Sequence, residues 1–189
     1  RLVGSEMCIR DSNITKKRVK TKRVNNLIFG FNLYLSSKIP KIKKIEGRMQ
    51  LVKKLYNGAR IFVDYAHTPD ALESCLTALR LHAQKHLTVV FGCGGDRDRG
   101  KRSKMGHAAC TLADRVIITD DNPRDEDPSV IRQEIMIGCS DNAVEVAGRD
   151  KAIEMAIAGL GEGDILLIAG KGHETSQIIG KNSMPFDDA

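Results

Sequence analysis

The sequence contains no tryptophan, and aromatic residues make up only 4% of its 189 residues. A hydrophobic core must therefore be built from aliphatic side chains, chiefly Val, Ile, Leu, Ala and Met. No two cysteines have the Cys-x-x-Cys spacing that zinc ribbons and redox motifs need, so neither kind of site is supported. Five scattered cysteines and no signal-peptide pattern predict a reducing, cytoplasmic environment.

Long apolar runs are also missing near the start of the chain. The longest stretch there, Leu27 to Leu35, is interrupted by Gly30 and Asn32. A membrane-spanning helix needs about 20 predominantly apolar residues. We therefore expect no membrane partner.

The net charge of +6 is unevenly distributed. Residues 1–60 hold 16 Lys/Arg and 3 Asp/Glu, whereas residues 61–189 hold 14 and 21. A nucleic-acid-binding protein that used the basic arm is one alternative, but the acidic balance after residue 60 argues against it. We expect residues 1–35 to be a basic, solvated arm, of which Arg1 to Ser12 is not native sequence, and residues 36–189 to form the domain.

From Arg60 onward, short apolar runs alternate with helical patterns. This alternation, with short connections, predicts an α/β fold: a Rossmann-like, mostly parallel sheet with helices on both faces. We expect strands at 61–64, 87–91, 116–119, 144–146 and 165–169, helices at 69–83, 101–112, 128–137 and 151–160, and a hairpin around residues 180–182.

Ligands of such sheets bind beyond the carboxyl ends of the strands. Four loops rich in charge, Gly or His follow the expected strands there, at 64–69, 92–102, 120–128 and 170–176. We therefore expect one functional edge.

The loop Gly95–Arg102 fits the spacing G-x-x-x-x-G-K, yet it is not a P-loop. A P-loop needs Ser or Thr after the lysine to hold magnesium, and Arg102 stands there instead. Its four internal charges suit ligand clamping, although a surface turn with internal ion pairs is an equal alternative.

The other loops each have a functional and a plain interpretation. Arg124 could bind a carboxylate bidentately while Asp121 and Asn122 accept from an ammonium, which together would suit a zwitterionic amino acid, but Asn-Pro is also a common turn. Glu174 could hold an amine, or its loop could be a flexible strand exit. Asp64 could accept from ribose hydroxyls, or cap a strand end. His67 could contact a phosphate or a reaction intermediate, or be a satisfied loop residue.

Taken together, five motifs resemble the C-terminal domain of the MurE-type ligases. They are Gly47–Met49 (GRM), Asp64–Ala71 (DYAHTPDA), Phe91–Arg97 (FGCGGDR), Asp120–Arg124 (DDNPR) and Gly170–Glu174 (GKGHE). The resemblance covers about residues 36–188, and the motifs are specific in combination. The family normally continues through one more helix beyond residue 189.

The resemblance implies a three-domain cytoplasmic enzyme of peptidoglycan synthesis that uses ATP and Mg²⁺. Such an enzyme phosphorylates the D-glutamate carboxylate of UDP-N-acetylmuramoyl-L-alanyl-D-glutamate, and the amine of meso-diaminopimelate attacks the acyl phosphate. The missing N-terminal and central domains would hold the UDP-sugar, the P-loop and the magnesium ligands. This chain alone is therefore expected to be inactive, with no metal site of its own.

The resemblance also implies residue roles. Arg97 and Arg124 would clasp the distal carboxylate of diaminopimelate, and Asp64 and His67 would contact the nucleotide. The rest of the amino-acid pocket would be lined by Asp121, Asn122, Pro123, Gly170 and Glu174. The alternatives are another Mur or folylpolyglutamate-type ligase, which would lack the DNPR and GKGHE pair, and a stand-alone nucleotide-binding module.

Overall fold

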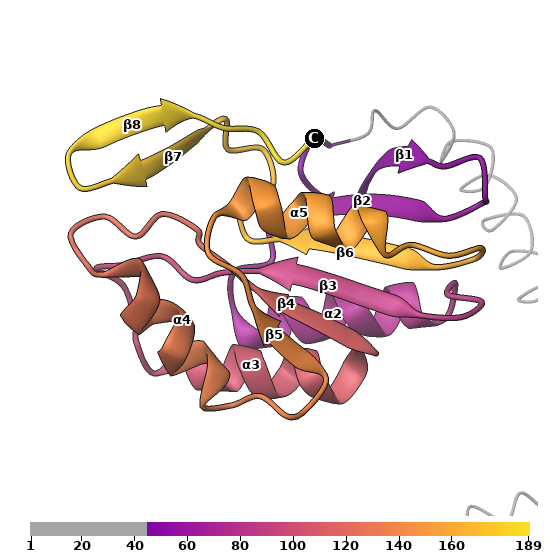
Figure 1. Cartoon of the computed structure of the whole chain (residues 1–189), viewed down its shortest axis with the longest axis horizontal. Coiled ribbons are helices and arrows are strands. Elements are labelled where there is room, and N and C mark those ends of the chain that lie inside the picture. The colour runs from indigo at the N-terminus through magenta and orange to yellow at the C-terminus, as the bar shows by residue number, and fades with distance from the viewer. Residues whose placement is uncertain (1–44) are drawn as a thin grey trace, which may run out of the picture. The chain divides into compact units, whose positions relative to one another are not determined.

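A six-stranded sheet forms the centre of the computed structural model, which describes residues 45–189. The strand order is β1-β2-β6-β3-β4-β5; β1 is antiparallel to β2, and all other pairs are parallel (Figure 1). The strands are β1 (Gln50–Lys54), β2 (Arg60–Asp64), β3 (Leu87–Phe91), β4 (Arg115–Ile118), β5 (Ala143–Glu145) and β6 (Ile165–Ala169). The predicted α/β class is confirmed, whereas the predicted arm and the boundary at residue 36 lie outside the described residues.

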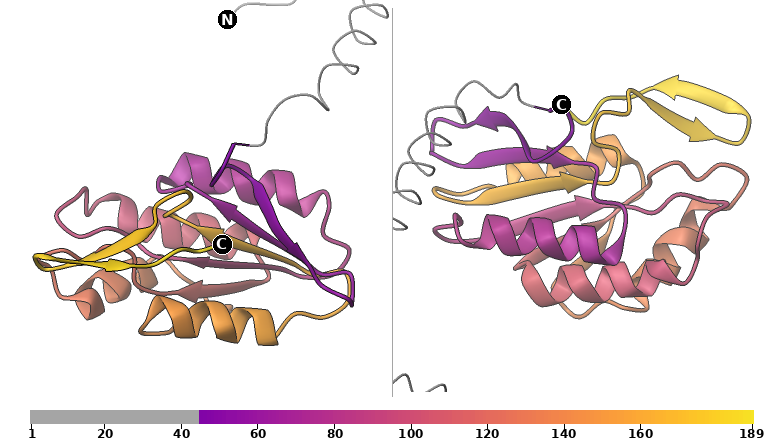
Figure 2. Two further views of the ribbon diagram at one scale, coloured as in Figure 1. Left: turned by 90° about the horizontal axis from the view of Figure 1, so that it is seen from above. Right: turned by 180° about the vertical axis from the view of Figure 1, so that it is seen from behind.

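Helices cover both faces of this sheet. One face packs against α2 (Pro69–Arg80), α3 (Lys101–Leu112) and α4 (Pro128–Met136), and the other against α5 (Arg149–Ala158). Figure 2 shows α2 and α5 on opposite sides of the sheet. The alternation of side chains along a strand explains the two cores: Val89 points toward α2 and α3, and Val90 toward α5. All five residues of β3 and of β6 are buried, as expected for central parallel strands.

Local capping rules fix where two of the helices begin. The Thr68 hydroxyl accepts from the Ala71 N–H at 3.3 Å, with Pro69 at the first helical position, and Asp127 caps α4 in the same way before Pro128. Helix α2 ends at Arg80, three residues earlier than predicted, and α5 begins at Arg149, two residues earlier.

Strand β1 was not predicted. Its sequence QLVKK contains two adjacent lysines and lacks a regular alternation of apolar and polar residues. This edge strand is mostly exposed, so it does not need an apolar face. It is held by antiparallel pairing with β2, which local patterns do not reveal.

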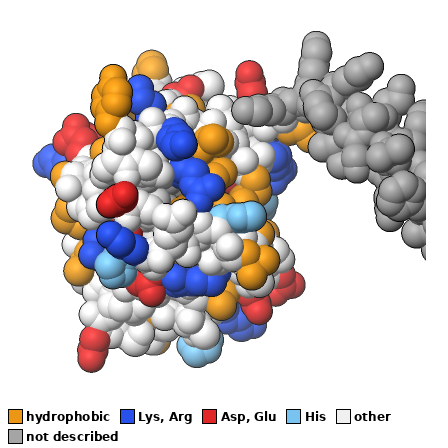
Figure 3. Space-filling view, turned by 90° about the vertical axis from the view of Figure 1, so that its right-hand side faces the viewer, with side chains coloured by type: hydrophobic (Ala, Val, Ile, Leu, Met, Phe, Trp, Pro, Cys, Tyr) orange, Lys and Arg blue, Asp and Glu red, His pale blue; other side chains and the backbone are white. Residues whose placement is uncertain are grey.

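The carboxyl ends of the parallel strands meet at one edge, next to a hairpin of β7 (Ser176–Ile179) and β8 (Asn182–Pro185). The hairpin was predicted. Figure 3 views the molecule from the opposite edge, where charged and hydrophobic side chains are interspersed. None of the helices in residues 45–189 is long and apolar enough to cross a membrane.

Candidate amino-acid-binding site

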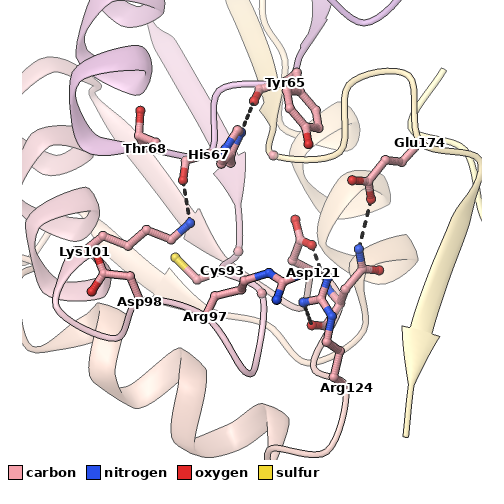
Figure 4. Close-up of a pocket in the computed structure, with 14 residues that line it drawn as sticks. Tyr65, His67, Thr68, Cys93, Arg97, Asp98, Lys101, Asp121, Arg124 and Glu174 are labelled. Atoms are coloured by element: carbon pink, nitrogen blue, oxygen red, sulfur yellow. Dashed lines mark hydrogen bonds between the residues drawn. The ribbon is translucent and has the colours of Figure 1, made fainter. Parts of the chain in front are cut away.

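A cavity of about 450 Å³ lies at the carboxyl edge of the sheet (Figure 4). The structure brings seven of the predicted site residues into its lining: His67, Arg97, Asp121, Asn122, Arg124, Gly170 and Glu174. It does not place Asp64 or Pro123 there. The lining side chains come from loops that follow β2, β3, β4 and β6, as the strand-end rule predicts.

Glycines allow these loops to touch one another through their backbones. A Cβ atom at Gly95 would overlap the carbonyl oxygen of Pro123, and one at Gly92 would overlap that of Thr119. Gly170 has φ +116°, and a Cβ there would lie 2.7 Å from an Asp121 carboxylate oxygen. At Gly92 and Gly95 the neighbouring backbone leaves no space for a side chain, and at Gly170 the left-handed backbone conformation favours glycine.

Arg124 is held in place by the hairpin. Its φ of 53° lies in the left-handed region, which costs a non-glycine residue free energy. The Arg124 N–H donates to the Ile178 carbonyl at 3.1 Å, and the Gly180 N–H donates to the Arg124 carbonyl at 2.7 Å. These two bonds form an isolated bridge between the 121–124 loop and β7.

Two guanidinium groups in this cavity have no carboxylate partner among the residues that the structure describes. Arg124 Nη1 donates to the carbonyl of Gly95 at 2.8 Å, and Arg97 Nη1 donates to that of Asp96 at 3.3 Å. Within residues 45–189, neither arginine forms an ion pair, and neither does Asp121. Figure 4 shows the Arg97 side chain pointing toward Asp121 and Arg124. The cavity therefore offers uncompensated charges of both signs.

A buried hydrogen-bond network holds the amide of Asn122. Its Oδ1 accepts from Lys171 Nζ and from the Ile178 N–H, both at 2.9 Å, while its Nδ2 donates to Glu174 Oε2 at 2.9 Å. Two donors on one oxygen fix the orientation of the amide. Asn122 Oδ1 thus already accepts two hydrogen bonds, and its contact with a ligand ammonium stays a prediction.

Arg102, the residue that excluded a P-loop, braces two of the loops. Its side chain is fully buried, pairs with both oxygens of Glu126 at 2.9 and 3.0 Å, and contacts Glu134 at 2.6 Å. Glu126 also accepts from the Asp96 N–H at 2.6 Å and pairs with Arg99 at 2.8 Å. The glycine-rich loop is thereby fastened to the loop that carries Arg124.

This brace predicts a dependence of stability on acid. The Arg102 guanidinium, assisted by the Asp96 N–H, lowers the pKa of Glu126 from its ordinary 4.5 to about 2. Because the folded-state pKa is depressed, the stabilisation is complete above about pH 4.5 and is lost as pH falls toward 2. We expect thermal unfolding to show a larger loss of melting temperature between pH 5 and 2.5 in wild type than in Glu126→Gln. Replacement of the exposed Glu73 by Gln should leave the pH dependence of the melting temperature as in wild type. If Glu126→Gln lost as much melting temperature as wild type over this pH range, Glu126 would not stabilise the fold through this brace.

The opposite end of the cavity carries His67 and Lys101. Lys101 Nζ donates to the His67 carbonyl at 2.7 Å, and the imidazole forms an edge contact with Tyr65, whose carbonyl lies 2.9 Å from Nδ1. The carboxylate of Asp64 is only 5% exposed and accepts from the Met49 N–H at 2.6 Å. Its contact with a nucleotide stays a prediction.

Cys93 also lines the cavity, but its chemistry is unsuited to nucleophilic catalysis. Burial raises the pKa of its thiol to about 12, so the reactive thiolate is scarce at neutral pH. No group of three or more His, Cys, Asp or Glu residues in the described part of the chain could hold a metal ion.

No role was predicted for Lys171 or Lys101, and Arg102 was considered only because it excludes a P-loop. The sequence around Lys171, a lysine between two glycines, does not indicate burial. Its burial follows from the packing of the 121–124 loop against it, which only the structure shows. Lys101 follows Gly100 at the start of α3, a position that could have suggested a side chain facing the strand ends.

Comparison with known proteins shows the family to which the chain belongs. The family model described as "Mur ligase, glutamate ligase domain" matches residues 47–172. A UDP-N-acetylmuramoyl-L-alanyl-D-glutamate–2,6-diaminopimelate ligase of Rickettsia prowazekii is 55% identical over 155 residues, 80% of this chain and 31% of that protein. The enzyme of the same name from Zymomonas mobilis is 52% identical over 151 residues, 78% of this chain and 31% of that protein. The chain thus spans about a third of these relatives.

Solved structures lead to the same family. A structure of a UDP-N-acetylmuramoyl-L-alanyl-D-glutamate–2,6-diaminopimelate ligase superposes with a TM-score of 0.72 and 44% identity, covering 80% of this chain and 31% of that one. A folylpolyglutamate synthase/dihydrofolate synthase of Yersinia pestis, solved with AMPPNP and a Mn ion, shares the fold at a TM-score of 0.54 and 17% identity, over 67% and 28% of the two chains. The chain therefore belongs to the Mur ligase family, in which it corresponds to the C-terminal, glutamate ligase domain.

Proposed function

We propose that this chain is the amino-acid-binding part of an ATP-dependent ligase that joins meso-2,6-diaminopimelate to UDP-N-acetylmuramoyl-L-alanyl-D-glutamate. The proposal rests on one observation: Arg97 and Arg124 pair with no carboxylate within residues 45–189, in a cavity that also holds Asp121 and Glu174. The relatives named above carry this activity in their names.

Diaminopimelate matches this distribution of charge. Its distal end bears one carboxylate and one ammonium on the same carbon. An arginine fork binds a carboxylate through two parallel hydrogen bonds, and carboxylates accept from an ammonium. Arg97 and Arg124 would take the distal carboxylate, and Asp121 with Glu174 would take the distal ammonium. The proximal amine would then be held where it can attack the activated D-glutamate, which is catalysis by positioning.

The nucleotide end of the cavity fits phosphate chemistry only in part. Lys101 provides a cation suited to phosphate oxygens, whereas the Nδ1–H of His67 is directed at the Tyr65 carbonyl. ATP, when bound by an intact ligase, supplies the phosphoryl group that activates the carboxylate. The magnesium ligands and the UDP-sugar site would belong to other domains.

The proposal is tested by calorimetric titration of the chain with meso-diaminopimelate and, separately, with L-lysine. Lysine equals diaminopimelate without its distal carboxylate, so we expect it to bind at least about tenfold more weakly. Equal affinities for the two amino acids would overturn the proposal. Binding of ATP without any binding of diaminopimelate would instead favour a stand-alone nucleotide-binding module.

We also expect the chain to have no ligase activity by itself. With ATP, magnesium, UDP-N-acetylmuramoyl-L-alanyl-D-glutamate and diaminopimelate, it should release no phosphate and form no amide. Positioning cannot accelerate an attack on an electrophile that is never formed. Chromatography of the nucleotide-sugar products and a phosphate assay measure this, and product above the enzyme-free blank would contradict it.

A further inference from the structure

Behind the cavity lies a lysine that does not line it. Lys171 is fully buried, and its Nζ contacts Asn122 Oδ1 at 2.9 Å and Glu174 Oε2 at 3.4 Å. Glu174 is the only carboxylate within residues 45–189 that pairs with it. A buried ammonium is costly unless a counter-charge compensates it. The compensating group here is itself 35% exposed and faces the ligand cavity.

Arg149, a second buried cation near this site, is in a different situation. Its guanidinium pairs with Asp188 at 2.6 and 2.7 Å, and both side chains are completely buried away from the cavity. Its charge is therefore neutralised by a residue that does not line this cavity. Within residues 45–189, Lys171 has no counter-charge other than Glu174. The electric field of its ammonium therefore acts on a ligand group bound in the cavity beside Glu174.

We propose that Lys171 is a specificity-determining residue whose buried positive charge disfavours an amino acid with a lone distal ammonium. The proposal rests on the proposed function of the cavity. An ammonium bound to Glu174 would lie roughly 6 Å from Lys171 Nζ, close enough for a strong like-charge repulsion at the effective dielectric of a protein site. Diaminopimelate escapes the penalty because its distal end has no net charge: the repulsion on its ammonium is offset by attraction to its carboxylate.

Three ligands that differ in the charged groups at their distal end separate this electrostatic role from a merely structural one. L-Lysine carries +1 at the distal end, meso-diaminopimelate 0, and 2-aminopimelate −1. In Lys171→Met we expect lysine to bind about tenfold more tightly than to wild type, diaminopimelate to change less than about threefold, and 2-aminopimelate to bind about tenfold more weakly. Loosening of the loop would instead weaken all three.

Calorimetric titration of the chain with each ligand measures the effect. Lys85→Met, which removes the same charge from an exposed site at the opposite edge of the sheet, should leave all three affinities unchanged. If Lys171→Met does not fold, Lys171→Gln replaces it, because glutamine removes the charge but keeps a donor for Asn122 Oδ1. Failure of lysine to bind more tightly to the folded variant overturns the inference while leaving the proposed function intact. Failure of wild type to bind diaminopimelate overturns the proposed function, and this inference with it.

Discussion

Replacing Arg124 by alanine in an intact ligase that carries this domain should raise the KM for diaminopimelate by roughly 30- to 1000-fold and leave the KM for ATP nearly unchanged. A partly desolvated, bidentate guanidinium–carboxylate pair is worth about 2–4 kcal/mol. Arg97→Ala should act in the same direction. Arg124→Lys should restore little, because an ammonium cannot reproduce the planar fork. Steady-state kinetics with diaminopimelate and with lysine give the two specificity constants to compare.

The competing explanation is that Arg124 only ties the loop to the Gly95 carbonyl. Its replacement would then lower stability without changing the preference between amino acids. Arg99→Ala is the control, since Arg99 lies near Arg97 in the glycine-rich loop but pairs with Glu126 and does not line the cavity. It should reduce the melting temperature and preserve the ratio of kcat/KM for diaminopimelate to that for lysine. If folded Arg124→Ala kept the wild-type ratio of kcat/KM for diaminopimelate to that for lysine, Arg124 would not bind the distal carboxylate.

Asp188→Asn should destabilise the domain by about 3–5 kcal/mol, because it leaves the Arg149 guanidinium buried without a counter-charge. Equilibrium denaturation in urea measures this as a lower midpoint. The neighbouring Asp187 is exposed, so Asp187→Asn should cost less than about 0.5 kcal/mol.

A double replacement sharpens that prediction. Arg149→Met with Asp188→Leu removes both charges and fills the space with apolar side chains, so it should cost less than Asp188→Asn alone. A midpoint for Asp188→Asn within error of wild type would mean that water reaches Arg149 and that the pair does not anchor the end of the chain.

The central part of the fold could be predicted because its signals are local. Strands β3 and β6 are buried on both faces and read as short apolar runs, and helix starts at Thr68 and Asp127 follow from capping chemistry. Strand β1 could not be predicted, because its stability comes from pairing with β2 rather than from its own residues.

In the site, too, features with local sequence signals could be predicted, and features that depend on distant residues could not. Placement of the 92–102, 120–128 and 170–176 loops at one edge follows from parallel strands alone. The orientation of the Asn122 amide did not follow, since it depends on Lys171 and on the Ile178 N–H from the hairpin, 49 and 56 residues away. The fully buried Arg102 was equally hidden, because its partners Glu126 and Glu134 lie in and beyond the next loop.

The bridge between Arg124 and the hairpin makes the hairpin a reporter of the cavity. The Arg124 and Gly180 N–H groups can exchange with solvent deuterium only when the bridge opens. A ligand that requires Arg124 in its left-handed conformation stabilises the closed state, by linkage, in proportion to its occupancy. Deuterium uptake at these two amides should therefore slow as the cavity fills, so occupancy could be followed at Gly180, a residue that does not line the cavity.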